Sequence, residues 1–93
     1  MDNRIYFFVS NDNIEAFESM QFIKSLLMFN NLDVHIFVKE KEVLMTKLYN
    51  VYEDAVMICV DEKSEVVSRV ELDDFSKESI LEKTLGVIRF YEW

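Results

Sequence analysis

The side chains that could carry covalent or metal chemistry are few and lie far apart along the chain. Cys59 stands inside an apolar run, where a cysteine acts as a small buried hydrophobe, whereas a reactive thiol needs exposure and positive neighbours. His35 is the only histidine. In the strand order predicted below, one strand lies between the strands of His35 and Cys59, so the two residues are about 10 Å apart. This distance is too long for a hydrogen bond between a nucleophile and its base. One cysteine and one histidine exclude an ordinary zinc site and an internal disulfide. We therefore predict a chain that is not an enzyme, has no metal site and no cofactor, and belongs in the reducing cytoplasm.

Acidic residues are the most distinctive feature, with eighteen acids against ten bases and a net charge of −8. Such a surface repels the phosphates of nucleic acids and anionic membranes, so we expect neither as a direct partner and instead expect a protein with a basic surface. Asp74, Glu78 and Glu82 recur every fourth residue, which predicts one row on a helix. The predicted partner-binding residues are Glu71, Asp73, Asp74, Glu78 and Glu82. The alternative is an ordinary solvated helix face.

The length of 93 residues and the apolar fraction of 51% predict a single domain over residues 1–93 with one unaided core. The first apolar stretch is too short for a signal peptide or a membrane span. Gly86 is the only glycine, which excludes a glycine-rich phosphate loop.

Two kinds of apolar pattern predict four strands. Arg4–Val9 and Ala55–Val60 are continuous apolar runs, typical of strands buried on both faces, whereas Leu32–Val38 and Glu65–Leu72 alternate, as strands near a sheet edge do. In the last strand we expect Val66, Val70 and Leu72 on one face. The turn 61–64 joins the third and fourth strands as an antiparallel hairpin.

Three segments with helical spacing separate these strands. The first is 14–29, capped by Asp12 with Glu15 in a capping box and ended by the two asparagines 30 and 31. The second is Lys39–Tyr52, and the third follows a cap at Asp73, Asp74 or Ser76. In the second helix the predicted inward side chains are Leu44, Leu48, Val51 and Tyr52.

The resulting order is β-α-β-α-β-β-α, an α/β fold. A helical crossover makes the first two strands parallel neighbours, and the continuous runs belong in the middle. We therefore predict a four-stranded mixed sheet of order 2-1-3-4 with helices on both faces. Leu32–Val38 is then an edge strand whose own charges are Asp33 and His35. Because natural edges are blunted by charge, proline or bulges, we expect this edge to be covered by a partner chain, a helix, or a second copy in a homodimer.

This element order resembles a minimal thioredoxin or glutaredoxin fold. The resemblance places the family's Cys-x-x-Cys motif within 10–17, which here contains no cysteine, and its cis-proline at Asp54-Ala55, in a chain without proline. It therefore implies a redox-inactive member. Asp12 and Asp61 each follow an apolar strand, as do the acids that bind magnesium in receiver domains. The thioredoxin-like order makes these two strands antiparallel, so the two acids lie at opposite ends of the sheet. We therefore expect Asp12 to act as a helix cap and Asp61 as a turn residue.

These observations lead to one functional hypothesis and two alternatives. The first is a non-enzymatic acidic protein-binding module, an adaptor or inhibitor of a larger protein, in one variant a nucleic-acid mimic; the size also fits a bacteriophage or mobile-element origin. The alternatives are a degenerate thiol-handling protein that uses Cys59, and a domain that only oligomerises or scaffolds. Aromatic residues left without a core position are candidate contact anchors if exposed, namely Phe29, Phe37, Tyr49 and Trp93.

Overall fold

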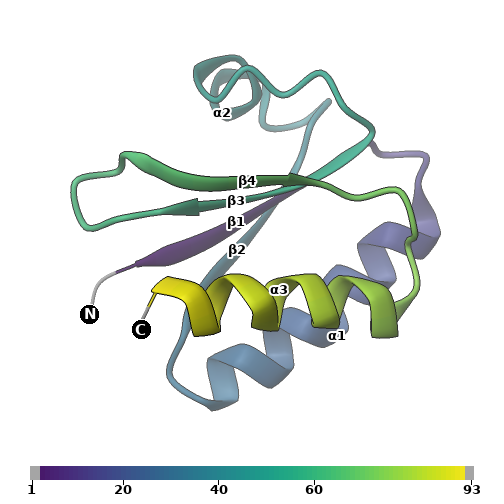
Figure 1. Cartoon of the computed structure of the whole chain (residues 1–93). Helices are drawn as coiled ribbons and strands as arrows, with labels where there is room; N and C mark the ends of the chain where they lie inside the picture. The colour runs from purple at the N-terminus through teal and green to yellow at the C-terminus, as the bar shows by residue number, and fades with distance from the viewer. Residues whose placement is uncertain (1–2, 92–93) are drawn as a thin grey trace.

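The computed structural model describes residues 3–91 and consists of one sheet with helices on both of its faces (Figure 1). The candidate anchor Trp93 lies outside the described residues. The elements are β1 (Arg4–Val9), α1 (Ile14–Phe29), β2 (Asp33–Val38), α2 (Val43–Leu48), β3 (Ala55–Val60), β4 (Val66–Glu71) and α3 (Lys77–Tyr91).

The strand order is β2-β1-β3-β4, which confirms the predicted 2-1-3-4 order. β1 pairs parallel with β2 and antiparallel with β3, and β3 pairs antiparallel with β4. Helices α1 and α3 cover one face and α2 lies on the other (Figure 1). Every residue of β3 is buried, because a central strand covered on both faces has no solvent side, and this explains the continuous apolar runs.

The face under α1 and α3 carries the larger core, in which Phe7 and Met57 pack with Met20 and Ile23 of α1 and Ile80 of α3. The opposite face carries a second cluster, built on Tyr6, Phe8, Val51, Val56, Ile58 and Val60 with Phe37, Met45 and Tyr49 packed against it. We call it the α2-face cluster.

Helix α1 spans the predicted residues, but its cap differs from the prediction. The side chain of Asn13, not Asp12, accepts a hydrogen bond from the Ala16 backbone N–H at 3.0 Å. The helix therefore begins one residue later than a capping box on Asp12 requires. Its end is as predicted: Asn31 has a φ of 64°, and the Leu32 N–H donates to the Leu27 carbonyl, the hydrogen bond of a Schellman motif.

The predicted helix Lys39–Tyr52 is wrong in extent and in orientation. Only Val43–Leu48 is helical, because the N–H groups of Lys41 and Glu42 bind the Val38 carbonyl in a turn. Val51 is buried as predicted. The other predicted inward side chains, Leu44, Leu48 and Tyr52, are 85%, 68% and 85% exposed, and Met45 and Tyr49 pack on the sheet in their place.

The fourth strand contains a β-bulge that the alternating pattern did not predict. Cys59 pairs with Ser68 but Val60 pairs with Val66, so β4 has one extra residue, Val67, at this point. The bulge reverses the alternation. Val67 therefore packs on the larger core together with Val70, whereas Val66 is exposed, contrary to the prediction.

Helix α3 begins at Lys77 after a cap by Ser76, one of the three predicted cap residues. The Ser76 hydroxyl accepts from the Ser79 N–H at 3.2 Å. Asp74 consequently lies before the helix, where its carboxylate accepts from the Ser76 N–H at 3.0 Å. The predicted helical row of Asp74, Glu78 and Glu82 is therefore wrong, since only the last two residues lie on α3.

Candidate functional site

One end of the sheet gathers exposed acidic side chains from segments that are distant in sequence. Val9 at the end of β1 pairs with Ala55 at the start of β3, and Glu71 at the end of β4 pairs with Val56. The first turns of α1 and α3 lie beside each other at this end (Figure 1), where the Ser19 hydroxyl donates to the Phe75 carbonyl at 2.6 Å. We call this region the acidic end. Its exposed acids are Asp12, Glu15, Glu40, Asp54, Glu71, Asp73, Asp74 and Glu78, against the bases Lys39, Lys41 and Lys77.

The predicted partner-binding residues are brought together only in part. Glu71, Asp73, Asp74 and Glu78 lie at the acidic end, whereas Glu82 follows one turn later on α3. Asp73 contacts Lys83 at 3.3 Å. Hydrogen bonds from the backbone and side chain of Ser76 lower the pKa of Asp74.

The loop between β1 and α1 is held to this end by hydrogen bonds to Asp54 and Glu40. The Ser10 N–H donates to the Asp54 carbonyl at 2.9 Å, and the side-chain amide of Asn13 donates to the Asp54 carboxylate. The Asn11 N–H donates to the Glu40 carboxylate at 2.8 Å. The position where the resemblance predicts a thiol pair is therefore a polar network of serine, asparagine and carboxylate groups.

An exposed apolar row adjoins the acidic end. Leu44 and Leu48 are one turn apart on α2, and Tyr52 follows in the segment that leads to β3; all three are largely exposed. Tyr52 precedes Asp54, a residue of the acidic end, by two residues. We call Leu44, Leu48 and Tyr52 the apolar row. Sequence reasoning missed it as a surface because its spacing is that of a buried helix face.

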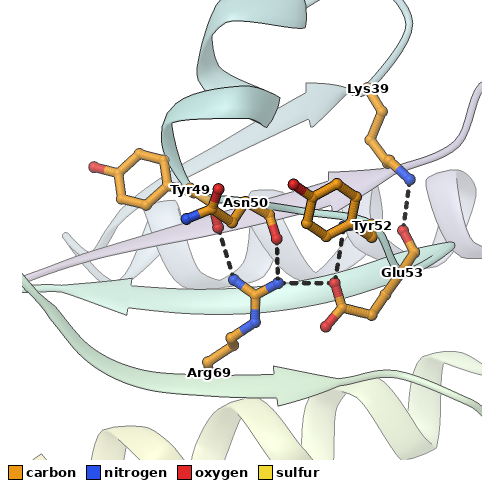
Figure 2. A network of polar contacts seen from close by, with 6 residues as sticks. All are labelled: Lys39, Tyr49, Asn50, Tyr52, Glu53 and Arg69. Atoms are coloured by element: carbon orange, nitrogen blue, oxygen red, sulfur yellow. Dashed lines mark hydrogen bonds and ion pairs between the residues drawn. The ribbon is translucent and has the colours of Figure 1, made fainter.

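The segment that carries Tyr52 is fixed by a network of polar contacts centred on Arg69 of β4 (Figure 2). The Arg69 guanidinium donates to the carbonyls of Tyr49 and Asn50 at 2.8 and 2.9 Å and to the Glu53 carboxylate at 2.8 Å. The Lys39 ammonium donates to the Glu53 carbonyl at 2.7 Å. Burial alone would raise the pKa of Glu53, but hydrogen bonds from backbone N–H groups and from Arg69 outweigh it and lower this pKa.

The predicted aromatic anchors divide into two groups. Phe29 is 87% exposed at the end of α1. Phe37 and Tyr49 instead pack into the α2-face cluster, where Tyr49 lies edge-on to Tyr6 with ring centroids 5.6 Å apart. Only Phe29 is thus available as an anchor among these three.

Cys59 is 0% exposed. Burial, followed by the negative charge of Asp61, raises the pKa of its thiol to about 11, so the thiol is protonated at neutral pH. Cys59 belongs to the core under α1 and α3, whereas His35 packs against Tyr6 of the opposite face. His35 has its own partner, the Asp33 carboxylate, at 2.9 Å. Cys59 therefore has the environment of a structural side chain.

We expect Cys59 to resist an aromatic disulfide reagent at neutral pH in the native protein and to react fully in denaturant. The physical reason is that both exposure and the thiolate form are needed for attack. Release of the coloured thiolate from the reagent measures the reaction. Fast and complete modification of the native chain would contradict the burial and restore the hypothesis of a thiol-handling protein.

Within residues 3–91 no three histidine, cysteine, aspartate or glutamate side chains lie close enough to hold a metal ion. None of the helices in these residues is both long enough and apolar enough to span a membrane. Asp12 and Asp61 lie at opposite ends of the antiparallel pair β1 and β3, and the Asp61 carboxylate accepts from the N–H groups of Lys63 and Glu65 in the predicted turn.

Comparison of the sequence with models of protein families and with curated proteins gives no match. Comparison of the structure with solved structures finds thioredoxins. The reduced thioredoxin pre-protein of Schistosoma mansoni is 16% identical, with a TM-score of 0.66 over 88% of this chain and 78% of that chain. Thioredoxin-2 of the malaria parasite is 10% identical, with a TM-score of 0.65 over 91% and 82% of the two chains. The J-Trx1 fragment of ERdj5 is 13% identical, with a TM-score of 0.68 over 95% of this chain and 44% of that chain.

These likenesses establish the fold. The matching structures carry the thioredoxin arrangement, the strand order is the predicted one, and the single cysteine lies within β3 and not in the loop after β1. The chain has a degenerate thioredoxin-like fold.

Proposed function

We propose that this chain is a non-enzymatic protein-binding module, an adaptor or inhibitor that engages a larger protein with a basic surface. The observation that carries the proposal is the exposure of Leu44, Leu48 and Tyr52, the apolar row, whose last member lies two residues before Asp54 of the acidic end. Apolar anchors surrounded by a charged rim are the usual composition of a protein-binding surface.

The apolar row supplies what the acidic residues alone lack, a source of affinity. Exposed leucine and tyrosine side chains bury substantial apolar area when a partner covers them, and tyrosine is enriched among the residues that dominate binding energy. Arg69 and Lys39 hold the following segment in place, so little ordering is needed when a partner binds.

The acidic end supplies selectivity for the sign of the partner's charge. Its eight exposed acids outnumber three bases, and complementary charge speeds encounter and fixes orientation more than it adds affinity. A basic surface that normally binds nucleic acid is one such partner, which would make the chain a nucleic-acid mimic. A bacteriophage or mobile-element source would suit an inhibitor of this size.

The test is affinity capture from the native host with the wild-type chain, followed by binding kinetics with the captured protein. We expect Tyr52→Ala to weaken binding by about 2 kcal/mol, since it truncates an exposed anchor. We expect the pair Asp73→Asn and Glu78→Gln to slow association, most strongly at low salt. Surface plasmon resonance at two salt concentrations separates the two effects.

Matched controls are available on other parts of the surface. Phe90→Ala removes a comparably exposed aromatic ring from α3, and Glu62→Gln with Glu65→Gln removes two charges from the β3–β4 turn. Both variants should leave binding unchanged. Competition by duplex DNA for the captured protein would identify the mimic variant. If the control variants weaken binding as much as the test variants, the proposed surface is wrong.

A further inference from the structure

We propose that the groove between β4 and α3 binds an extended basic segment of a partner protein, which adds as a further strand to the free edge of β4. An apolar side chain of this segment fills the groove over Gly86. The groove lies on the α3 side of the sheet, whereas the apolar row lies on the α2 side (Figure 1). The two surfaces can therefore bind different partners, and the proposal does not depend on the proposed function.

The groove lies at an edge of the sheet, because β4 is the last strand in the strand order of the described residues. Its volume is about 390 Å³, within the range of pockets that hold ligands. Ser68 and Val70 of β4 line one side, and Gly86, Val87 and Phe90 of α3 line the other. The Phe90 ring is 77% exposed, so an apolar wall stands open to solvent beside the strand edge.

The only glycine of the chain, Gly86, stands in the interior of α3. Glycine destabilises a helix interior relative to alanine, so its presence there needs another reason. The backbone does not supply one, since Gly86 has no positive φ. Packing does not supply one either, because no atom of the described residues lies within 4 Å of the place where a Cβ would stand. The missing side chain keeps this part of the groove open for the close approach of another chain.

The free edge of β4 offers two residues whose backbone groups point outward. The Leu72 N–H donates to a β3 carbonyl at 3.0 Å, and the groups of successive residues in a strand point alternately to its two sides. The N–H and C=O groups of Arg69 and Glu71 therefore point away from β3, and both residues are exposed. Beyond them the edge is closed, because the Tyr91 hydroxyl donates to the Val67 carbonyl at 2.7 Å.

A strand that pairs with Arg69 and Glu71 presents its side chains alternately to the two faces of the sheet. Those on the α3 side meet the groove, to which Ser68 and Val70 already point. In recognition by strand addition, backbone hydrogen bonds supply affinity and pockets for alternate side chains supply specificity. On the opposite face Arg69 is bound by Glu53 at 2.8 Å, which leaves Glu71 to pair with the added strand.

The charges at the rim of the groove favour a basic segment. Glu71 lies on the strand edge, and Glu82 precedes Gly86 by one turn of α3. Among the described residues, Lys83 is the only base that lines the groove, and Asp73 contacts it at 3.3 Å. Opposite charges on neighbouring strands stabilise the pair, so a lysine or arginine next to Glu71 fits this edge.

The test uses a capped hexapeptide in which lysine and leucine alternate, titrated into the isotope-labelled full chain and followed by nuclear magnetic resonance. We expect saturable binding in which the amides of Arg69 and Glu71 exchange more slowly with deuterium, because they become donors to the peptide. A second peptide, in which three lysines precede three leucines, cannot place its leucines on one face of a strand. It measures attraction to the net charge alone, and we expect its dissociation constant to be about tenfold higher.

Two variants change the groove and its rim. Gly86→Leu fills the groove without a clash, and we expect it to raise the dissociation constant of the alternating peptide about tenfold. Its urea midpoint should not fall, since leucine favours a helix more than glycine does. Glu71→Lys places like charges side by side and should raise the constant about fivefold. Ser25→Leu adds the same leucine to an exposed position of α1 and should leave peptide binding unchanged.

The variants of the two surfaces serve as controls for each other. Phe90→Ala truncates the wall of the groove and should weaken peptide binding, although it spares the apolar row. Tyr52→Ala truncates the apolar row and should leave peptide binding unchanged. These opposite responses separate a failure of this proposal from a failure of the proposed function.

Three results overturn the proposal. The first is that millimolar alternating peptide leaves the amides of Arg69 and Glu71 unprotected. The second is binding that Gly86→Leu does not weaken or that the second peptide reproduces. The third is a change in the fluorescence of Trp93, the only tryptophan, on Gly86→Leu without any peptide binding, since the groove then belongs to the end of this chain.

Discussion

Replacing Arg69 with methionine is expected to lower the free energy of unfolding by about 2 kcal/mol. The change leaves the carbonyls of Tyr49 and Asn50 and the carboxylate of Glu53 without the donor that they share (Figure 2). These bonds fix the end of α2 and the segment after it, where Asn50 has a φ of 53°. Urea unfolding measures the loss.

The conservative variant separates the geometry of Arg69 from its charge. Arg69→Lys keeps the charge but cannot present several donors in a fixed fork, so it should recover less than half of the lost stability. Amide exchange at Val51, whose N–H donates to the Thr46 carbonyl, should accelerate in both variants. A loss below about 0.5 kcal/mol, which is typical of an exposed ion pair, would contradict the predicted role.

The second large effect concerns the dependence of stability on pH through Cys59. The pKa of the buried thiol is raised from 9.0 to about 11. A group with a raised pKa in the folded state binds its proton more tightly when folded, so its contribution is present below pH 9 and lost as the pH rises toward 11. Two units correspond to about 2 to 3 kcal/mol.

The experiment compares the wild type with Cys59→Ala in urea at pH 8 and at pH 11. At pH 8 the variant should be less stable, because it leaves a small cavity and lacks this contribution. At pH 11 the difference should shrink by about 2 kcal/mol. Val60→Ala, from the same buried strand, removes a side chain without a titratable group, and its deficit should be the same at both pH values. A constant deficit for Cys59→Ala would contradict the raised pKa.

The sheet could be predicted from the sequence because burial on one or two faces leaves different patterns in a strand. Ala55–Val60 is apolar throughout because both of its faces are covered, while β2 alternates at the edge. Both patterns depend only on the local period of two, and they determined the order of the strands.

The sequence could not predict which side of α2 is buried. Leu44 and Leu48 lie one position before Met45 and Tyr49, so two apolar faces are adjacent around the same short helix. Packing selects the second pair because Tyr49 meets Tyr6 and Phe8 on the sheet. Because Tyr6 and Phe8 belong to β1, their contact with Tyr49 cannot be predicted from the spacing of apolar residues within 39–52.

The remaining errors have local causes. Asp12 and Asn13 are both good cap residues, and only the backbone path decides between them. The bulge at Val67 shifts the alternation of inward and outward side chains in β4 by one residue. No residue type in β4 indicates a bulge at this position. The acidic end combines loops that are joined only when the sheet forms, so Asp12, Glu40 and Asp54 could not be grouped with Asp73 in advance.

The central position of β1 means that its two neighbouring strands become available at different times during synthesis on the ribosome. β1 is synthesised first, and with α1 and β2 it can form a parallel unit early. Its other edge waits for β3, since Phe8 pairs with Val56, and at about 5–20 residues per second that delay lasts seconds. During this interval the nascent chain presents an apolar strand edge with Tyr6 and Phe8 uncovered. A fragment that ends before Ala55 thus presents an apolar strand edge suited to binding by chaperones.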